Sequence, residues 1–198
     1  MDQLLLNIHP QSIKSLENFV IGENFETIAT IRHFLTDINL QFFFLWGDKG
    51  SGKSHISEIV KRDNILVIED IESYDNIGQI EVFNIFNDYK ENNKKLFITG
   101  SNSPNNMGLR SDLASRLSWG LVYQIKVLTD AKKKLALLSH AKQKGMLFDN
   151  KVIEYCMKHL KRDLHYLIAT LDALDSWSLK EKKPITTQLL KKLLAKKR

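Results

Sequence analysis

The chain has 198 residues, of which 43% are apolar and 26% are charged, with nine glycines, three prolines and a formal net charge of +6. This composition excludes disordered, collagen-like and low-complexity chains and predicts one globular domain, or one domain with a small appendage. Residues 1–125 carry 11 Lys and Arg against 16 Asp and Glu (net −5), whereas residues 126–198 carry 18 against 7 (net +11). The basic C-terminal third is either a surface that faces nucleic acid or a solvated helical face rich in lysine.

No segment of the sequence has the pattern of a membrane span or an export signal. The longest apolar run, Phe42–Trp46, is far shorter than the roughly 20 residues that a membrane helix needs. The N-terminus has an acid, Asp2, where a secretory signal has basic residues. Cys156 is the only cysteine and is interpreted as a packed core residue rather than a nucleophile. We therefore expect a cytoplasmic protein without a membrane partner.

Strand and helix patterns alternate through the first two thirds of the chain. Apolar residues at a spacing of three to four predict helices over residues 28–35 and 80–89. Short apolar runs predict four strands, at Phe42–Trp46, Ile65–Glu69, Leu96–Gly100 and Leu121–Lys126. Strands that alternate with helices predict an α/β fold with a parallel sheet covered on both faces.

A phosphate-binding loop follows the first strand directly. Residues 47–54 match the full G-x-x-x-x-G-K-[ST] pattern, as Gly47, Asp48, Lys49, Gly50, Ser51, Gly52, Lys53 and Ser54. Its three glycines are expected to adopt positive φ and to turn backbone N–H groups toward phosphate oxygens, while the helix that starts near Lys53 adds its positive end. In this pattern Lys53 meets the β- and γ-phosphates and Ser54 ligates Mg²⁺.

The second strand ends in two acids, which a phosphate-binding loop needs for its metal and for the attacking water. Glu69 is the candidate metal ligand in a place where aspartate is usual, and Asp70 is the candidate for the attacking water, with a shorter side chain than the usual glutamate. Fast hydrolysis by this chain is therefore not expected. The alternative is that both acids merely end a buried strand.

The connection from the loop to the second strand is short. Only residues 55–64 separate them, which leaves room for one short helix, whereas nucleotide-binding sheets of this type usually insert a further strand and helix there. We therefore expect about four strands, with the edge strand lost and the edge of the next strand exposed.

Three further polar residues occupy places where such ATPases carry functional groups. Ser101, just after the third strand, is positioned to reach the γ-phosphate, and Arg162 is positioned to fold over the phosphates from a helical subdomain. Arg116 is expected on a short helix at the rim of the sheet, where it can reach only the nucleotide of a neighbouring subunit and act as an arginine finger in trans. Arg162 as an exposed helix-start residue and Arg116 as a surface ion-pair partner are the structural alternatives.

After Val127 the pattern is entirely helical. Caps and periodicity predict four helices, opened by Thr129, Asp149, Asp163 and the segment 184–186. We therefore divide the chain into a tail (1–12), a nucleotide-binding α/β subdomain (13–127) and a small all-helical lid (128–198).

Five segments in this order resemble the Hda proteins, DnaA-related AAA+ regulators of bacterial replication initiation. They are Leu16–Asn24, the loop with the preceding Leu45-Trp46, Thr99–Ser101, Asp112–Gly120 and Thr170–Asp175. The resemblance implies that the first segment grips the adenine, with Phe19, Val20, Ile21, Gly22 and Asn24 as its contact residues. It also implies that the chain binds ADP or ATP, together with Mg²⁺.

The extreme N-terminus resembles the peptide by which Hda proteins dock on the replicative sliding clamp. In such an extended peptide Gln3 is the polar anchor, and Leu4, Leu6 and Ile8 enter an apolar groove. The alternative is a leucine-rich terminus that packs back on the core.

The resemblance therefore implies a negative regulator of initiation, which docks on the DNA-loaded sliding clamp and stimulates hydrolysis of DnaA-bound ATP through Arg116. Its partners are expected to be DnaA, the clamp (the β subunit of DNA polymerase III) and DNA without sequence preference, and it is a candidate homo-oligomer. One alternative is a self-hydrolysing AAA+ ATPase of the helicase-loader type. The other is a small-molecule kinase, which is disfavoured because the lid has one helix-opening arginine, Arg162, and no arginine cluster for a second phosphorylated substrate.

Overall fold

The computed structural model describes residues 15–16 and 19–195. The chain divides into two compact units between Leu128 and Thr129, which we call the sheet unit and the lid unit. Among the described residues, no helix is long and apolar enough to cross a membrane.

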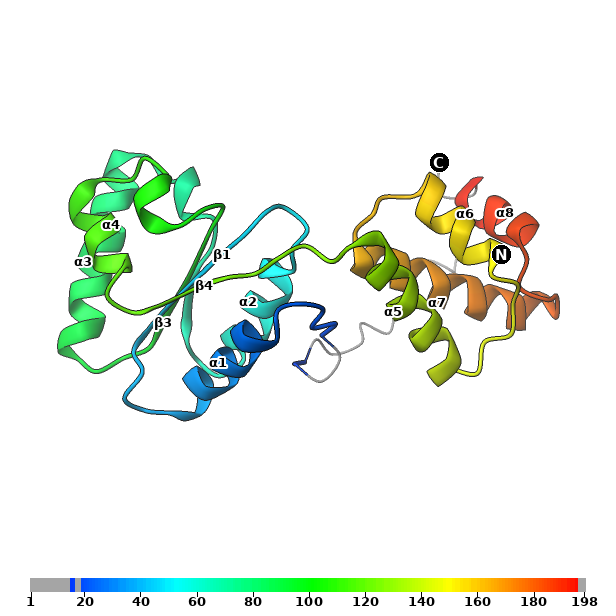
Figure 1. Cartoon of the computed structure of the whole chain (residues 1–198), viewed down its shortest axis with the longest axis horizontal. Helices are drawn as coiled ribbons and strands as arrows, with labels where there is room; N and C mark the ends of the chain where they lie inside the picture. The colour runs from blue at the N-terminus through cyan, green and yellow to red at the C-terminus, as the bar shows by residue number, and fades with distance from the viewer. Residues whose placement is uncertain (1–14, 17–18, 196–198) are drawn as a thin grey trace, which may run out of the picture. The chain divides into compact units, whose positions relative to one another are not determined.

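The sheet unit alternates strands and helices (Figure 1). Its elements are α1 (Phe25–Thr36), β1 (Phe42–Trp46), α2 (Lys53–Lys61), β2 (Leu66–Ile68), the 3₁₀ turn η1 (Ile71–Ser73), α3 (Asn76–Glu91), β3 (Leu96–Gly100), the 3₁₀ turn η2 (Pro104–Asn106), α4 (Ser111–Leu117) and β4 (Leu121–Gln124). The four strands are parallel and lie in the order β2-β3-β1-β4, so the predicted α/β fold with a four-stranded sheet is confirmed. Within the described residues β2 pairs only with β3 and forms one edge of the sheet.

Helices cover both faces of this sheet because side chains alternate along its central strands. Phe43 and Leu45 of β1 pack with α1 and α2, whereas Phe44 packs on the opposite face with α3 and α4. Figure 1 shows these two pairs of helices on opposite sides of the strands. The carboxyl ends of the parallel strands lie at the same end of the sheet, where Trp46 of β1 is in register with Gly100 of β3. Functional side chains that follow these strands therefore gather at the carboxyl end of the sheet.

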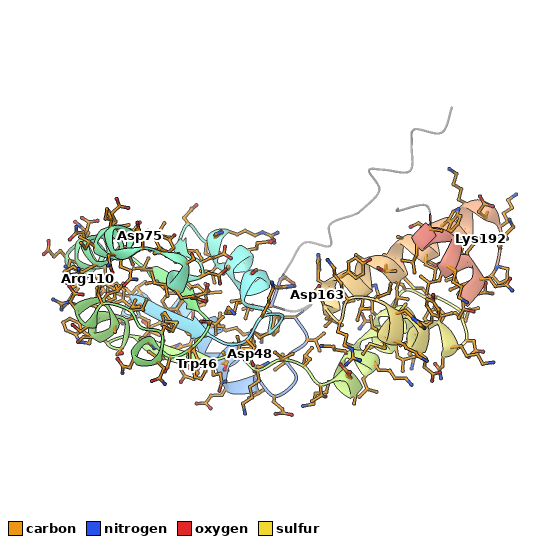
Figure 2. All side chains as sticks on the ribbon, turned by 90° about the horizontal axis from the view of Figure 1, so that it is seen from above. Trp46, Asp48, Asp75, Arg110, Asp163 and Lys192 are labelled. Atoms are coloured by element: carbon orange, nitrogen blue, oxygen red, sulfur yellow. The ribbon has the colours of Figure 1, made fainter. Side chains whose placement is uncertain are left out.

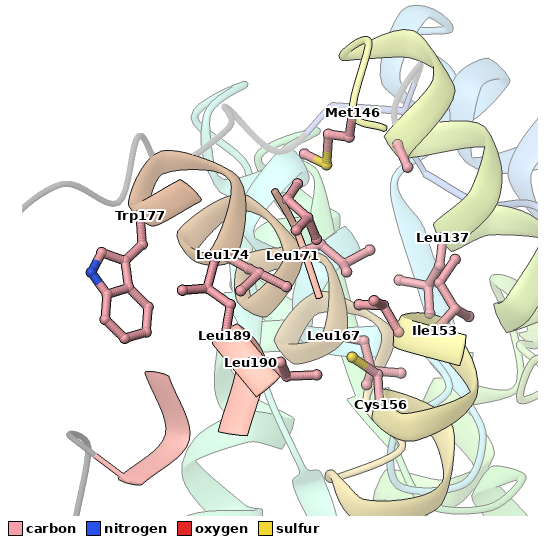
Figure 3. Close-up of a cluster of buried hydrophobic side chains, with 13 residues drawn as sticks. Leu137, Met146, Ile153, Cys156, Leu167, Leu171, Leu174, Trp177, Leu189 and Leu190 are labelled. Atoms are coloured by element: carbon pink, nitrogen blue, oxygen red, sulfur yellow. The ribbon is translucent and has the colours of Figure 1, made fainter. Parts of the chain in front are cut away.

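The described part of the lid unit forms four helices around its own core. They are α5 (Asp130–Gln143), α6 (Lys151–His159), α7 (Leu164–Glu181) and α8 (Thr187–Ala195). Figure 3 shows the core, in which Leu137, Ile153, Leu167, Leu171 and Leu190 are at most 1% exposed. The all-helical lid predicted from the sequence is thus confirmed.

The caps of these helices largely match their sequence signals. The Thr129 hydroxyl accepts a hydrogen bond from the N–H of Lys132, and the Asp163 carboxylate accepts one from the N–H of Tyr166 at 2.8 Å. At α6 the cap position is Asn150 rather than the predicted Asp149. Asp149 still satisfies an N–H group there, because its carboxylate accepts a hydrogen bond from Lys151 at 3.0 Å.

Candidate functional site

The phosphate-binding loop lies between the end of β1 and the start of α2; Figure 2 labels Trp46 and Asp48 on either side of its first glycine. Gly50 and Gly52 have φ of 83° and 106°, which side chains other than glycine rarely adopt. Gly47 is different, because a Cβ there would lie 2.2 Å from the carbonyl oxygen of Ile125. The expectation that all three glycines supply positive φ was therefore wrong for Gly47, which provides space instead.

Three features of this loop fit an anion. Among the described residues no side chain caps α2 at Gly52, so the N–H groups of the first turn remain available to phosphate oxygens. The Ser51 hydroxyl is buried and has no hydrogen-bond partner among the described residues. The Lys53 ammonium donates to the carbonyl of Gly47 at 2.5 Å and so lies over the loop.

The segment before α1 is fixed against this loop. The Phe19 ring lies 2.9 Å from where a Cβ on Gly52 would be and packs edge to face on the His55 ring, 5.4 Å between centroids. Val20 and Ile21 are half-buried and Gly22 is exposed with φ 61°. Packing of Phe19 on the loop places this segment beside the phosphate site.

The buried Asn24 has a structural task that the sequence did not suggest. Its amide exchanges two hydrogen bonds with the backbone of Lys126, at 2.9 and 2.7 Å, just after β4. The Thr27 hydroxyl donates to the carbonyl of Gln124 at 2.8 Å. These bonds tie the start of α1 to the end of β4, and the Asn24 amide has little capacity left for a ligand.

The acidic end of β2 is held by two partners. Asp70 has left-handed backbone angles (φ 49°, ψ 57°), and its N–H donates to the Thr99 hydroxyl at 3.0 Å. The Glu69 carboxylate accepts a hydrogen bond from Lys61 Nζ at 2.5 Å. Sequence reasoning missed Lys61, whose charge partly neutralises the proposed metal ligand. The described residues contain no cluster of three His, Cys, Asp or Glu that could hold a metal by themselves.

Ser101 directly follows β3 and therefore lies at the carboxyl end of the sheet, where the phosphate-binding loop also begins. The carbonyl of Gly100 accepts a hydrogen bond from the N–H of Gly47 at 3.2 Å, which brings the end of β3 beside the loop. Ser101 is exposed, as is Ser54 at the start of α2. The structure thus brings Ser101 and the loop together within the sheet unit.

Arg116 lies in the last turn of α4, and aromatic rings cover its guanidinium. The guanidinium carbon lies 4.0 Å from the centroid of the Trp119 ring and 5.6 Å from that of Phe83. Within the described part of the chain, its N–H groups have no hydrogen-bond or ion-pair partner. Arg110 at the start of the same helix contrasts with it, because the Arg110 guanidinium donates two hydrogen bonds to Asp112. This pair raises the pKa of Arg110 and lowers that of Asp112.

Arg162 belongs to the lid unit and is exposed. It precedes the cap residue of α7, and its guanidinium lies 2.8 Å from Asp130 Oδ2. The two residues line a hollow of about 410 Å³ with Lys134, Glu154 and Lys158 of the same unit. The ion pair with Asp130, 32 residues away, was missed by sequence reasoning. Of the other candidate residues, Gln3, Leu4, Leu6 and Ile8 lie outside the described residues.

Comparisons with known proteins identify the family. The family model described as the Hda lid domain matches residues 130–194, and that of the bacterial DnaA ATPase domain matches residues 56–124. The chain belongs to the Hda/DnaA-related AAA+ family. An uncharacterized protein of Haemophilus influenzae is 30% identical to this Hda/DnaA-related chain over 228 residues, which cover 97% of the chain and 98% of that protein.

Solved structures show the same fold. Domain III of the Thermotoga maritima replication initiation protein DnaA has a TM-score of 0.74 at 16% identity, covering 95% of this chain and 97% of that one. AMPPCP-bound DnaA from Aquifex aeolicus has a TM-score of 0.64 at 21% identity, covering 85% of this chain and 68% of that one. The AAA+ fold inferred from the sequence is therefore confirmed.

Proposed function

We propose that this Hda/DnaA-related chain is a negative regulator of replication initiation that stimulates hydrolysis of ATP bound to DnaA, with Arg116 as the arginine finger. The observation that carries the proposal is the guanidinium of Arg116, whose N–H groups have no partner among the described residues; Arg116 lies in the segment that the DnaA ATPase-domain model matches. A guanidinium in this state is ready to donate to the oxygens of a phosphoryl group. Arginine fingers accelerate slow hydrolysis by about 10³–10⁵-fold because they offset the charge that develops during transfer.

The chain itself is proposed to hold ADP or ATP. The backbone of residues 47–52 and the Lys53 ammonium would contact the phosphates, and the segment from Phe19 to Asn24 would flank the base. The buried Ser51 hydroxyl and the start of α2 support this assignment, since neither has a side-chain partner in the part of the chain that the structure describes. When bound, the nucleotide supplies negative charge that offsets the N–H groups converging on the loop.

Mg²⁺ would accompany the phosphates, with Ser54 and Glu69 as its ligands from this chain. Ser101, Asp70 and Arg162 are proposed to sense the γ-phosphate or to orient water. The ion pair of Glu69 with Lys61 supports weak hydrolysis by this chain, because a carboxylate that shares its charge with an ammonium is a poorer metal ligand. This pairing favours the regulator over the self-hydrolysing loader.

Docking on the sliding clamp through Gln3, Leu4, Leu6 and Ile8 is part of the proposal and rests on the sequence pattern. Tethering to the clamp would raise the local concentration of the two partners without a stronger contact between them. DNA that passes through the clamp is proposed as a further contact of the basic lid, without sequence preference. Self-association of this chain is a further candidate interaction.

The test is a single-turnover assay of ATP preloaded on DnaA, with clamp-loaded DNA and this chain added. We expect acceleration by the wild type, loss of acceleration in Arg116→Ala, and weakened stimulation in Gln3→Ala/Leu4→Ala at low protein concentration. Arg110→Ala is the matched control, since the Arg110 guanidinium already donates two hydrogen bonds to Asp112. Turnover of ATP by this chain alone, without an effect on DnaA, would instead establish the loader function.

A further inference from the structure

We infer that Trp119 is a positioning residue that holds the Arg116 guanidinium in the orientation a finger needs, an inference that rests on the proposed function. The Trp119 indole is 54% exposed, an unusual place for a large aromatic ring. The centroid of its ring lies 4.0 Å from the guanidinium carbon of Arg116, closer than the centroid of the Phe83 ring at 5.6 Å. The residue that orients the finger is thus supplied by the turn that follows α4.

The geometry of stacking explains why this contact helps a finger. A guanidinium stacks through its flat faces, whereas its N–H groups project from its edges. Stacking on Trp119 therefore fixes the direction of the side chain without consuming a donor. An ion pair such as that of Arg110 with Asp112 would fix the side chain equally well but would occupy the donors.

The ring of Trp119 is itself anchored to the sheet. It packs edge to face on Phe86 of α3, with centroids 6.5 Å apart, and Phe86 stacks on Phe42 of β1 at 3.9 Å. The next residue, Gly120, approaches the backbone of Phe42 so closely that a Cβ would lie 2.5 Å from its carbonyl oxygen. The rings of Trp119, Phe86 and Phe42 thus form a continuous set of contacts between Arg116 and the first strand of the sheet.

Lys90 provides a matched control in the same place. Its ammonium lies 4.3 Å from the centroid of the Trp119 ring, and the side chain is exposed on α3. We expect Lys90→Gln to remove a cation from the ring and to keep the contact of Trp119 with Arg116. General loss of positive charge near the finger is thereby distinguished from loss of the stacking partner.

The variants are Trp119→Leu, which removes the π face, and Trp119→Phe, which keeps an aromatic face. In the DnaA assay we expect Trp119→Leu to lower the maximal stimulated rate by about two- to five-fold, the range set by an exposed cation–π contact. The protein concentration that gives half-maximal stimulation should not change. Trp119→Phe and Lys90→Gln should stay near the wild-type rate.

A second measurement follows the orientation of Arg116 without DnaA. In protein with ¹⁵N-labelled arginine, stacking on an indole shifts the Arg116 Hε resonance through the ring current. We expect Trp119→Leu to abolish this shift and Lys90→Gln to retain it. Thermal unfolding of each variant checks that the fold is intact, which the exposure of Trp119 favours.

The outcomes separate the two proposals. If Arg116→Ala still stimulates hydrolysis, the proposed function fails whatever Trp119 does. If Arg116→Ala is inactive but Trp119→Leu retains the full maximal rate, Trp119 does not position the finger. If Trp119→Leu changes only the protein concentration that gives half-maximal stimulation, Trp119 is an interface residue. If Trp119→Leu stimulates faster than the wild type, stacking restrains the finger. Either result overturns the inference.

Discussion

At the scale of single residues, Gly50 and Gly52 have the same backbone requirement but different surroundings. Both have positive φ, yet a Cβ on Gly50 meets nothing within 4 Å, whereas one on Gly52 would lie 2.9 Å from the Phe19 ring. We predict that Gly50→Ala loses about 1–2 kcal/mol of unfolding free energy from backbone strain. Gly52→Ala should lose about 1–3 kcal/mol more because Phe19 must move.

Urea unfolding of both variants measures this difference, and thermal shift with ADP measures binding. Displacement of Phe19 should weaken nucleotide binding in Gly52→Ala more than in Gly50→Ala, since Phe19 belongs to the segment proposed to flank the base. Equal losses of stability in the two variants would mean that the Phe19 contact has no energetic consequence.

The single thiol offers a probe of the lid. Cys156 is fully buried in the lid core, and burial raises the pKa of its thiol to about 11. Because the thiolate is the reactive form, we predict that a thiol reagent at pH 8 labels the folded protein at least about a hundred-fold more slowly than the protein in denaturant. Rapid labelling under native conditions would mean that the lid opens readily around α6.

At the scale of elements, local signals and distant contacts were not equally accessible to the sequence. The loop over residues 47–54 and the start of α2 were predicted because each depends on neighbours in the chain. Partners that meet only after folding were not: Lys61 with Glu69, Asp130 with Arg162, and Asn24 with the backbone of Lys126, 102 residues away. Periodicity identifies which face of a helix is buried but not which charge lies opposite.

A partly buried polar contact joins α5 to α7 in the lid unit. Asp172 Oδ1 lies 2.6 Å from His140 Nε2 and 2.8 Å from Lys144 Nζ, and its side chain is only 16% exposed. Burial opposes ionisation of Asp172, but hydrogen bonds from His140 and Lys144 outweigh it and lower its pKa. The charged carboxylate therefore stabilises the folded lid.

We predict that Asp172→Asn lowers the unfolding free energy by about 1–3 kcal/mol at pH 7, the cost of weakening a hydrogen-bonded buried charge. A lowered folded-state pKa gives stability that is present above the ordinary carboxyl value of about 3.9 and is lost as the pH falls through the folded value. The difference between wild type and Asp172→Asn should therefore shrink below about pH 4. Urea unfolding as a function of pH measures it.

Glu154→Gln is the matched control for this prediction. Glu154 pairs with Lys134 at 3.3 Å in the same unit, but its side chain is 60% exposed. Exposed pairs contribute little, so this variant should unfold like the wild type at neutral pH. A difference between wild type and Asp172→Asn that persists unchanged into acid would show that the carboxylate charge is not its source.

At the scale of the whole molecule, charge is segregated along the chain, on the two sides of the boundary between Leu128 and Thr129. Residues 129–198 carry 17 Lys and Arg against 7 Asp and Glu (net +10), and residues 1–128 carry 12 against 16 (net −4). The structure shows that these lysines are not equivalent. Lys133 is only 7% exposed, Lys134 pairs with Glu154 and Lys183 pairs with Glu181, so a test of DNA contact should use other positions.

Lys180 on α7 and Lys192 on α8 are exposed and suit this purpose; Figure 2 labels Lys192 on the lid. We predict that Lys180→Glu/Lys192→Glu binds duplex DNA more weakly than the wild type. Each lost phosphate contact should reduce the slope of log K against log salt concentration by about 0.9. Arg32→Glu/Lys126→Glu makes the same charge change at exposed residues of the sheet unit. Fluorescence anisotropy between about 50 and 200 mM salt measures the DNA affinity of both double variants. An equal loss of affinity in both would mean that net charge alone attracts DNA. A loss of affinity confined to the lid variant would locate the DNA contact on the lid.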